Sequence, residues 1–313
     1  MNNKREAPDF LIVGAAKSGT TILWEWLAAN PAVFVPKFKE PHFYCFTDKK
    51  KFCLGAELDP FYSKEFVVDR SQYASTWLNV EPNRLCGEAS PGYLYFPESA
   101  ARIARDNPNC RIIAILRKPT DRAFSQFMHH VRDGYEPCLN FESALSNEDA
   151  RIRAGWWWGY HYKSAGLYYE QWKNYCLLFP REQRLLLLYD DLVENPEKCY
   201  RMICEFLQIR EEKPDFQRRA NQSHGIARVP NAGALQQMLR HGSVVSRVAH
   251  QFLPSKLLAD VKKQVETLNS RDAPTMSKSS IDQLQLYFEP NIQKLSDLIG
   301  RDLNIWLKKQ HDR

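Results

Sequence analysis

The sequence predicts an α/β fold in which helices flank a doubly wound parallel sheet. Three short apolar runs, rich in branched residues, indicate buried parallel strands at residues 10–13, 111–116 and 184–189. A weaker candidate strand covers residues 84–88. A helical pattern follows each of the three strong runs, and this alternation of strand and helix is typical of a parallel sheet with helices on both faces. Ligands of such sheets bind at the carboxyl ends of the strands.

Four helices are expected in the first two thirds of the chain, over residues 20–29, 120–132, 166–179 and 195–207. Pro119 and Pro196 lie near the first turn of two of them, where proline is favoured because the first N–H groups of a helix have no intrahelical partner. Ser164 is the expected N-cap of the third helix, which ends before Pro180.

Beyond about residue 210 the strand signal disappears. Residues 235–268 contain two helical stretches broken by Pro254, and residues 281–298 contain another. The last hundred or so residues are therefore expected to form a helical cap without strands.

We expect one domain, because neither an internal repeat nor a Gly/Ser-rich linker divides the sequence. This domain would cover residues 9–313 after a disordered N-terminus at 1–8. An α/β core at 9–208 would bind a nucleotide, and a mainly helical cap at 209–313 would face the second substrate.

The composition is that of a folded globular protein, with 44% hydrophobic and 26% charged residues among 313. No signal-peptide core or stretch of roughly 18 apolar residues is visible, so a cytoplasmic location is expected. A net charge of +6 suits an anionic small molecule, but the 43 basic and 37 acidic residues are interspersed, so no nucleic-acid partner is expected. The eight cysteines are scattered singly, which argues against a zinc site or a disulfide framework.

The segment Gly14-Ala-Ala-Lys17-Ser-Gly19-Thr20-Thr follows the first strand and resembles a phosphate-binding loop with a displaced lysine. The usual loop reads G-x-x-x-x-G-K-S/T, and its lysine reaches the terminal phosphates of a nucleotide. Gly14 and Gly19 keep the spacing, but Thr20 takes the lysine position. Lys17 lies inside the loop, where it suits a donor that transfers a group from its 5′-phosphate.

A second anion site is indicated where the strand at 111–116 ends. Arg117 follows this strand directly, and Ser125 lies about two helical turns later. The planar fork of arginine suits a dianionic phosphate. Two anion sites imply a donor that is phosphorylated at two separate places.

These motifs together resemble the sulfotransferases that use 3′-phosphoadenosine-5′-phosphosulfate (PAPS), in particular the branch that includes the heparan sulfate sulfotransferases and many bacterial relatives. The resemblance covers roughly residues 9–208. Six motifs carry it, namely G-A-A-K-S-G-T-T at 14–21, K-E-P-H-F at 39–43, G-E-A-S-P-G-Y at 87–93, the element with Arg117 and Ser125, A-G-L-Y at 165–168, and L-L-L-L-Y-D-D-L at 185–192. It implies a P-loop-like fold, PAPS as donor, 3′-phosphoadenosine-5′-phosphate (PAP) as product, and no metal.

The resemblance also assigns roles to residues. Lys17 would be the catalytic lysine, Glu40 the base that takes the proton from an acceptor hydroxyl, and His42 a second base or a positioning group. The donor would be bound by residues from three parts of the chain, namely Ala16, Lys17, Ser18, Gly19, Thr20 and Thr21 of the loop, Arg117 and Ser125 of the 3′-phosphate element, and Tyr168. Arg228, in a late segment with Gly225, is the candidate that would close over the nucleotide.

The acceptor is expected to be a carbohydrate, a lipid or another small molecule with a free hydroxyl. Trp156, Trp157 and Trp158 could form a wall that grips it, or they could be core residues. Residues 235–258 combine apolar and basic residues, a pattern that suits a lid helix, a plain amphipathic helix or weak contact with a membrane surface. The sequence specifies no oligomeric state.

Two other functions fit parts of the sequence. A P-loop kinase or NTPase would use the phosphate loop together with Asp190, at the end of a Walker-B-like strand, but Thr20 lacks the charge that such an enzyme needs. A non-catalytic nucleotide-binding protein would need only the fold. The joint presence of Lys17, Glu40 and Arg117 favours an enzyme.

Overall fold

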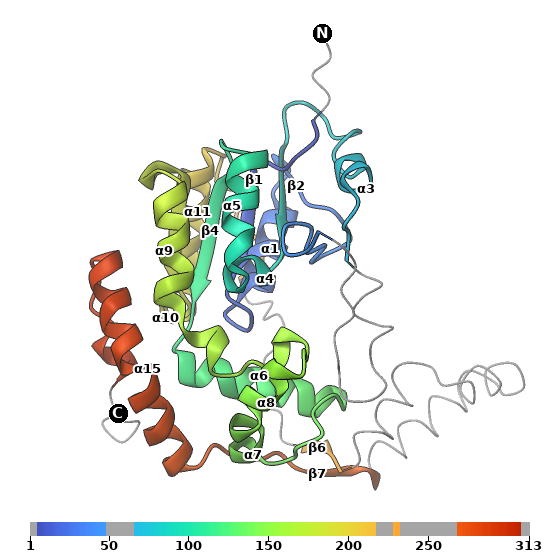
Figure 1. Cartoon of the computed structure of the whole chain (residues 1–313). Helices are drawn as coiled ribbons and strands as arrows, with labels where there is room; N and C mark the ends of the chain where they lie inside the picture. The colour runs from blue at the N-terminus through green and yellow to red at the C-terminus, as the bar shows by residue number, and fades with distance from the viewer. Residues whose placement is uncertain (1–4, 48–65, 217–227, 232–267, 308–313) are drawn as a thin grey trace, which may run out of the picture.

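The computed structural model describes residues 5–47, 66–216, 228–231 and 268–307 (Figure 1). A parallel five-stranded sheet lies at its centre, with the strand order β2-β3-β1-β4-β5. The strands are β1 (Phe10–Gly14), β2 (Val33–Phe34), β3 (Leu85–Ala89), β4 (Arg111–Leu116) and β5 (Arg184–Leu188). The predicted fold class, a doubly wound parallel sheet flanked by helices, is confirmed.

Strand β1 lies in the middle of the sheet, between β3 and β4. Phe10 is opposite Gly87 on one side and Arg111 on the other. The Phe10 ring lies against Gly87 so closely that a Cβ at this glycine would be 2.0 Å from the ring. Only glycine therefore fits at this point of β3, one residue before Glu88.

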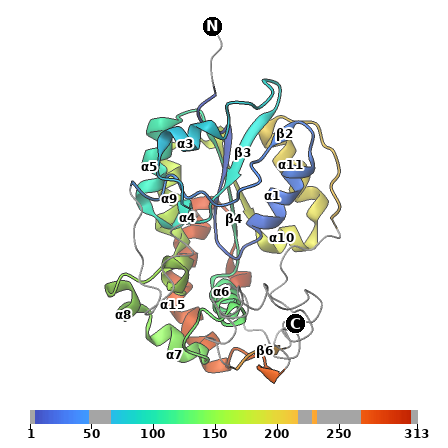
Figure 2. The same cartoon turned by 90° about the vertical axis from the view of Figure 1, so that its right-hand side faces the viewer.

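Alternate residues of the strands point into two separate cores, as the period of a β-strand requires. Leu11 and Val13 belong to the larger core, and Phe10 and Ile12 to the smaller one. Helices α4, α5 and α9 cover one face of the sheet, and α1, α10 and α11 cover the other (Figure 2). Their bounds are Gly92–Tyr95 (α4), Pro97–Asp106 (α5), Tyr168–Leu178 (α9), Thr20–Ala29 (α1), Tyr189–Glu194 (α10) and Pro196–Leu207 (α11).

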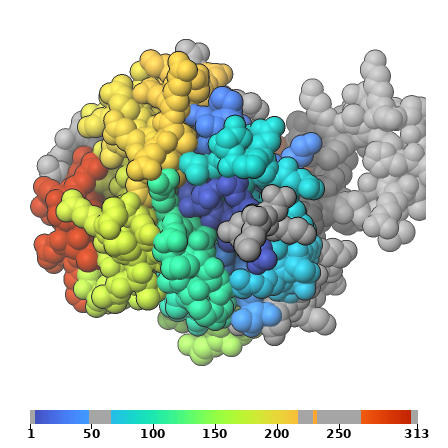
Figure 3. All heavy atoms as spheres, turned by 90° about the horizontal axis from the view of Figure 1, so that it is seen from above, coloured from blue at the N-terminus to red at the C-terminus, as the bar shows by residue number. Residues whose placement is uncertain are grey.

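A second group of helices lies beyond the carboxyl ends of the strands (Figure 1). The long helix α6 follows β4 and leads into α7 and α8, and the C-terminal helix α15 packs against α6 and α9. Seen from above, α15 lies at the margin of the molecule beside α9 (Figure 3). The bounds are Pro119–Asp133 (α6), Phe141–Ser146 (α7), Glu148–Arg153 (α8) and Lys278–Ile299 (α15).

The remaining described elements are short. They are helix α3 (Arg70–Ser75), the 3-10 turns η1 (Trp158–Tyr160), η2 (Ser164–Gly166), η3 (Arg181–Gln183) and η4 (Asn304–Trp306), and the strands β6 (Arg228–Pro230) and β7 (Ser270–Asp272). Strands β6 and β7 form an antiparallel pair of their own. The expectation that no strand follows residue 210 was therefore wrong.

Other local predictions shift slightly. Tyr189 was predicted to end a strand, but it begins α10. Ser164 does not cap α9: it lies in η2, and its backbone N–H and hydroxyl donate to Glu148. The helix predicted at 281–298 is confirmed as α15, whereas the stretches predicted at 235–268 lie, except for Leu268, outside the described residues. Among the described helices, none is both long and apolar enough to cross a bilayer.

Candidate active site

The loop between β1 and α1 is built around its two glycines. A Cβ at Gly14 would lie 2.7 Å from the Cβ of Leu94, so the backbone of this loop passes directly over α4. Gly19 precedes α1 with a φ of 103°, a left-handed conformation that favours glycine. The loop therefore delivers its N–H groups and the N-terminus of α1 to one point, as an anion site requires.

Lys17 lies in this loop, with its ammonium close to charges from other elements. Burial and, to a smaller extent, the nearby Arg132 lower its pKa to about 8, although Asp133 and Glu40 oppose the shift. An ammonium that is costly to keep charged is stabilised when an anion approaches. The loop is thus electrostatically prepared for a negatively charged ligand.

Arg117 connects the end of β4 to the same loop. Its guanidinium donates to the backbone oxygen of Lys17 at 3.2 Å and lies over the ring of Tyr189, 4.7 Å from the ring centre. Tyr168 is buried and donates its phenolic hydrogen to the backbone oxygen of Arg117 at 3.0 Å. After β1 the chain crosses to β2 at one side of the sheet, and after β4 it continues to β5 at the other side. Ligands of open α/β sheets bind in the crevice between two strands whose connections run in opposite directions.

The other residues predicted to bind the donor are distributed around this crevice. Ser125 is buried on α6, the helix that follows Arg117. Ser18 is fully buried beside the Tyr168 phenol, but its hydroxyl makes no hydrogen bond of good geometry with any described residue. The backbone of Arg228 lies in β6 opposite Asp272, and its side chain is not among the described parts. Ala16 is partly exposed, and Thr20 and Thr21 open α1.

Glu40 and His42 lie in a turn that follows β2. The Glu40 carboxylate is 3.0 Å from the Lys39 ammonium and 3.7 Å from Nε2 of His42. Desolvation alone would raise the pKa of Glu40, but the hydrogen bond with His42 and the charge of Lys39 hold that pKa at about 2. The carboxyl group is therefore ionised at neutral pH and can accept a proton.

A polar chain and an aromatic shell fix His42. Its backbone N–H donates to the Ser90 hydroxyl at 3.1 Å, and Ser90 donates in turn to the Glu88 carboxylate at 2.8 Å. Four rings meet the His42 imidazole edge to face, namely Phe66, Tyr93, Trp157 and Trp158. Trp157 and Trp158 are buried in this shell, so two of the three tryptophans are core residues beside the site.

Glu88 is a buried carboxyl group. It belongs to the motif at 87–93, but the sequence analysis assigned it no role. It accepts hydrogen bonds from Tyr73, Ser90 and Tyr93 at 2.9, 2.8 and 2.5 Å. Burial raises the pKa of Glu88, and the three hydroxyl donors oppose that shift. Glu88 thereby ties the end of β3 to the turn that holds His42.

Three further site residues come from the C-terminal end of α6, and the sequence analysis missed them. Arg132 donates to His129 at 2.8 Å and to both carboxylate oxygens of Asp133 at 2.8 and 3.0 Å. Burial and the charge of Lys17 lower the pKa of His129 to about 4, so this imidazole is neutral at pH 7. The sequence shows two adjacent histidines in an amphipathic helix, His129 and His130. Nothing in that pattern indicates that His129 lies close enough to feel the charge of Lys17.

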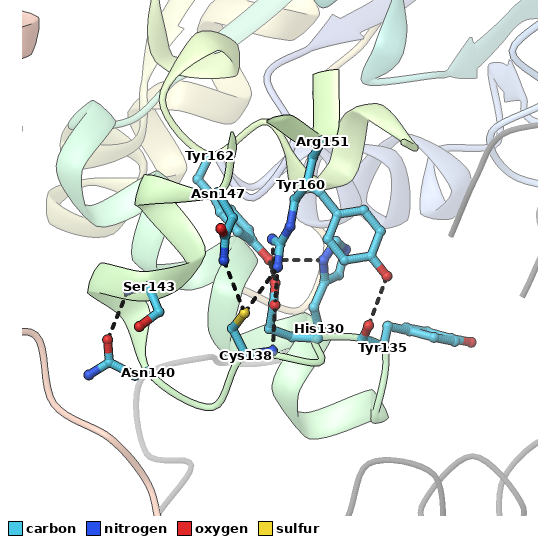
Figure 4. A network of polar contacts seen from close by, with 10 residues as sticks. His130, Tyr135, Cys138, Asn140, Ser143, Asn147, Arg151, Tyr160 and Tyr162 are labelled. Carbon is cyan, nitrogen blue, oxygen red and sulfur yellow. Dashed lines mark hydrogen bonds and ion pairs between the residues drawn. The ribbon is translucent and has the colours of Figure 1, made fainter. Parts of the chain in front are cut away.

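A buried network supports this end of α6 from behind (Figure 4). Arg151 donates to both carboxylate oxygens of Glu136 at 3.0 and 2.6 Å, and both side chains are almost fully buried. Tyr162 donates to Glu136 and lies 3.3 Å from Nδ1 of His130, the neighbour of His129. The network therefore joins α6, α8 and the segment after η1 that contains Tyr162.

Backbone conformation marks the same residues. Among the described residues other than glycine, positive φ angles occur at Lys17 (65°), Glu40 (64°), His42 (52°) and Gln208 (58°). Such conformations cost free energy and cluster at functional sites. Three of the four are the residues that the resemblance singles out as catalytic.

Comparisons with known proteins find sulfotransferases. A family model described as a sulfotransferase domain matches residues 7–225. The chain is 24% identical to heparan sulfate glucosamine 3-O-sulfotransferase 5 of Mus musculus over 305 residues, which are 96% of this chain and 74% of that protein. It is 32% identical over 125 residues to the membrane-associated sulfotransferase kil1 of Dictyostelium discoideum, but this match spans 40% of the chain and only 23% of the relative.

A solved structure resembles the whole fold. The sulfotransferase from Alicyclobacillus acidocaldarius superimposes with a TM-score of 0.74 at 28% sequence identity, over 96% of this chain and 99% of that one.

Proposed function

This chain belongs to the sulfotransferase family, and from that premise we propose that it transfers a sulfuryl group from PAPS to the hydroxyl of a carbohydrate, a lipid or another small acceptor. One observation carries the proposal. The guanidinium of Arg117, directly after β4, donates to the backbone oxygen of Lys17 in the loop after β1, so this hydrogen bond joins two loops that each carry a cationic residue. A donor with a 5′-phosphosulfate and a 3′-phosphate needs such a pair of cationic sites.

The residues of the crevice fit this donor. The loop N–H groups and the hydroxyls of Ser18, Thr20 and Thr21 would hold the 5′-phosphosulfate, and Arg117 with Ser125 would hold the 3′-phosphate. The buried Ser18 hydroxyl, which lacks a well-formed hydrogen bond in the described structure, supports a ligand oxygen beside it.

The proposed transfer needs little more than positioning and charge neutralisation. Glu40 accepts the proton of the acceptor hydroxyl, whose oxygen forms a bond to sulfur. The bond between sulfur and the 5′-phosphate oxygen breaks, and its electron pair stays on that oxygen. Lys17 neutralises the oxygen, because its ammonium lies in the loop that would hold the phosphate. The His42 imidazole, whose Nε2 is next to the Glu40 carboxylate, keeps this carboxylate in position.

A carbohydrate is the acceptor that we favour. The proposal draws on the mouse relative, whose name states that it sulfates a glucosamine of heparan sulfate. Among the three tryptophans, Trp157 and Trp158 pack around His42, while Trp156 is partly exposed and lies under the Arg151 guanidinium. Aromatic rings beside the candidate base suit an acceptor with an apolar ring face.

A kinase or NTPase fits less well. Asp190, the candidate Walker-B acid, accepts a hydrogen bond from the Trp306 indole at 2.8 Å, and Asp191 pairs with Arg301. These carboxylates fasten the C-terminal segment to α10. Thr20 also lacks the charge that a terminal phosphate needs.

A thermal-shift assay without magnesium tests the proposal. PAP at about a hundred times its dissociation constant should stabilise the fold by about 2.7 kcal/mol and raise the melting temperature by about 5 °C. Transfer of label from ³⁵S-PAPS to pooled glycans should follow, and Lys17→Ala should abolish it. Stabilisation by Mg-ATP but not by PAP would refute the proposal.

A further inference from the structure

The side chain of Lys39 bridges two parts of the site. Its ammonium donates to the hydroxyl of Thr21 at 2.7 Å and to the Glu40 carboxylate at 3.0 Å. Thr21 stands in the first turn of α1, at the phosphate loop, and Glu40 stands in the turn after β2. The Lys39 side chain is only 21% exposed, so this cation lies between loop and carboxylate.

The contact also orients the Thr21 hydroxyl. An ammonium can only donate hydrogen bonds, so the Thr21 oxygen must act as the acceptor in this pair. Its own hydrogen is then available to a ligand oxygen on the side of the loop. Lys39 thereby prepares the Thr21 hydroxyl as a donor group for an anion.

A carboxylate base beside an anionic donor creates an electrostatic difficulty. Glu40 must be ionised to accept a proton, yet the donor brings several negative charges to the neighbouring loop. Two like charges a few ångströms apart repel strongly in a partly desolvated site. A cation placed between them removes the difficulty, and Lys39 is in contact with both sides.

We propose that Lys39 is a positioning residue that screens the charge of Glu40 from the bound nucleotide and holds Thr21 toward it. This inference rests on the proposed function and adds a residue to it. In this proposal Lys39 strengthens nucleotide binding because Glu40 is negatively charged. A lysine that only contacts a phosphate, or only stabilises the fold, would not depend on Glu40.

A double-mutant cycle with PAP as the probe tests this dependence. Affinities are measured by calorimetry at low ionic strength for the wild type, Lys39→Met, Glu40→Gln and the double variant. Lys39→Met should weaken PAP binding about tenfold, because the charge of Glu40 then faces the nucleotide. Glu40→Gln should bind PAP at least as tightly as the wild type, and adding it to Lys39→Met should restore most of the lost affinity.

Two controls make the cycle selective. Lys39→Arg keeps the charge and should retain affinity within about threefold. Lys37→Met removes an exposed cation two residues away and should change affinity less than twofold. Circular dichroism melts confirm that each variant is folded.

Two outcomes would overturn the inference. One is a double variant as weak as Lys39→Met, because Lys39 would then act independently of Glu40. The other is Lys39→Met binding PAP like Lys37→Met. Failure of the wild type to bind PAP would instead reject the proposed function, so the two failures are distinguishable.

Discussion

The Glu40 carboxylate lies 3.7 Å from Nε2 of His42, and both residues adopt a left-handed backbone. Each conformation of this kind costs on the order of 1–3 kcal/mol and persists only where the surroundings impose it. At His42 the Ser90 hydroxyl accepts from the strained backbone N–H. The strained backbone of this turn therefore costs conformational free energy, and it places a carboxylate and an imidazole next to each other.

Replacing the carboxylate of Glu40 should separate binding from chemistry. Glu40→Gln is expected to lower kcat about 10²–10⁴-fold, because the amide cannot accept the proton of the hydroxyl. PAP affinity should not fall. Steady-state kinetics with a labelled glycan acceptor and calorimetry measure the two effects. Glu98→Gln, at an exposed carboxyl on α5, is the control, and an equal loss there would contradict the assignment.

The pH profile should report the titration of Lys17. Its ammonium is needed in the charged form, and the pKa of this group in the free protein is about 8. We expect kcat/KM for the donor to fall as the pH rises through about 8, since this parameter follows the free enzyme. Lys17→Arg stays charged and should move the fall to higher pH. A decline unchanged in that variant would show that another group causes it.

Lys17 should also reduce the stability of the fold. Its pKa falls from 10.5 in the unfolded chain to about 8 in the folded protein, so the charged form disfavours folding below pH 8. Lys17→Met should raise the free energy of unfolding at pH 7 by about 1–3 kcal/mol. The advantage should shrink between pH 8 and 10.5, as the wild-type ammonium loses its proton. Urea denaturation at pH 7 and 9.5 gives both values, and a destabilised variant at pH 7 would contradict the prediction.

The buried pair of Glu136 and Arg151 should matter for stability through its charge. Arg151→Met leaves the Glu136 carboxylate buried without its partner and should cost about 3–5 kcal/mol. Arg153→Met, at an exposed position on the same helix, should change stability by less than about 0.5 kcal/mol. Chemical denaturation compares the two variants. Equal stabilities would show that the pair contributes nothing.

The sequence predicted the sheet well because its strands are continuous apolar runs. Residues 111–116 coincide with β4, and residues 84–88 differ from β3 by one position. Strand β2 was missed, since two residues give no periodicity. Strands β6 and β7 were missed because they pair across about forty residues, and no local pattern encodes such a partner.

The site was predictable only where a residue sits in a recognisable loop. Lys17 and Arg117 follow strands, so their convergence could be expected from the parallel sheet. Lys39 and His129 gave no such signal: one looks like a surface lysine in a turn, the other like half of a histidine pair on a helix. Their importance arises from tertiary contacts. The roles assigned to all these residues stay predictions.

The placement of Lys17 and Arg117 at the ends of two adjacent strands has a thermodynamic consequence. They are a hundred positions apart in the chain, and their hydrogen bond exists only when β1 and β4 lie together. No short fragment of the chain contains both residues, so ligand binding requires the assembled sheet. A melting curve recorded through the fluorescence of a bound, fluorescently labelled PAP analogue should therefore superimpose on one recorded through backbone dichroism.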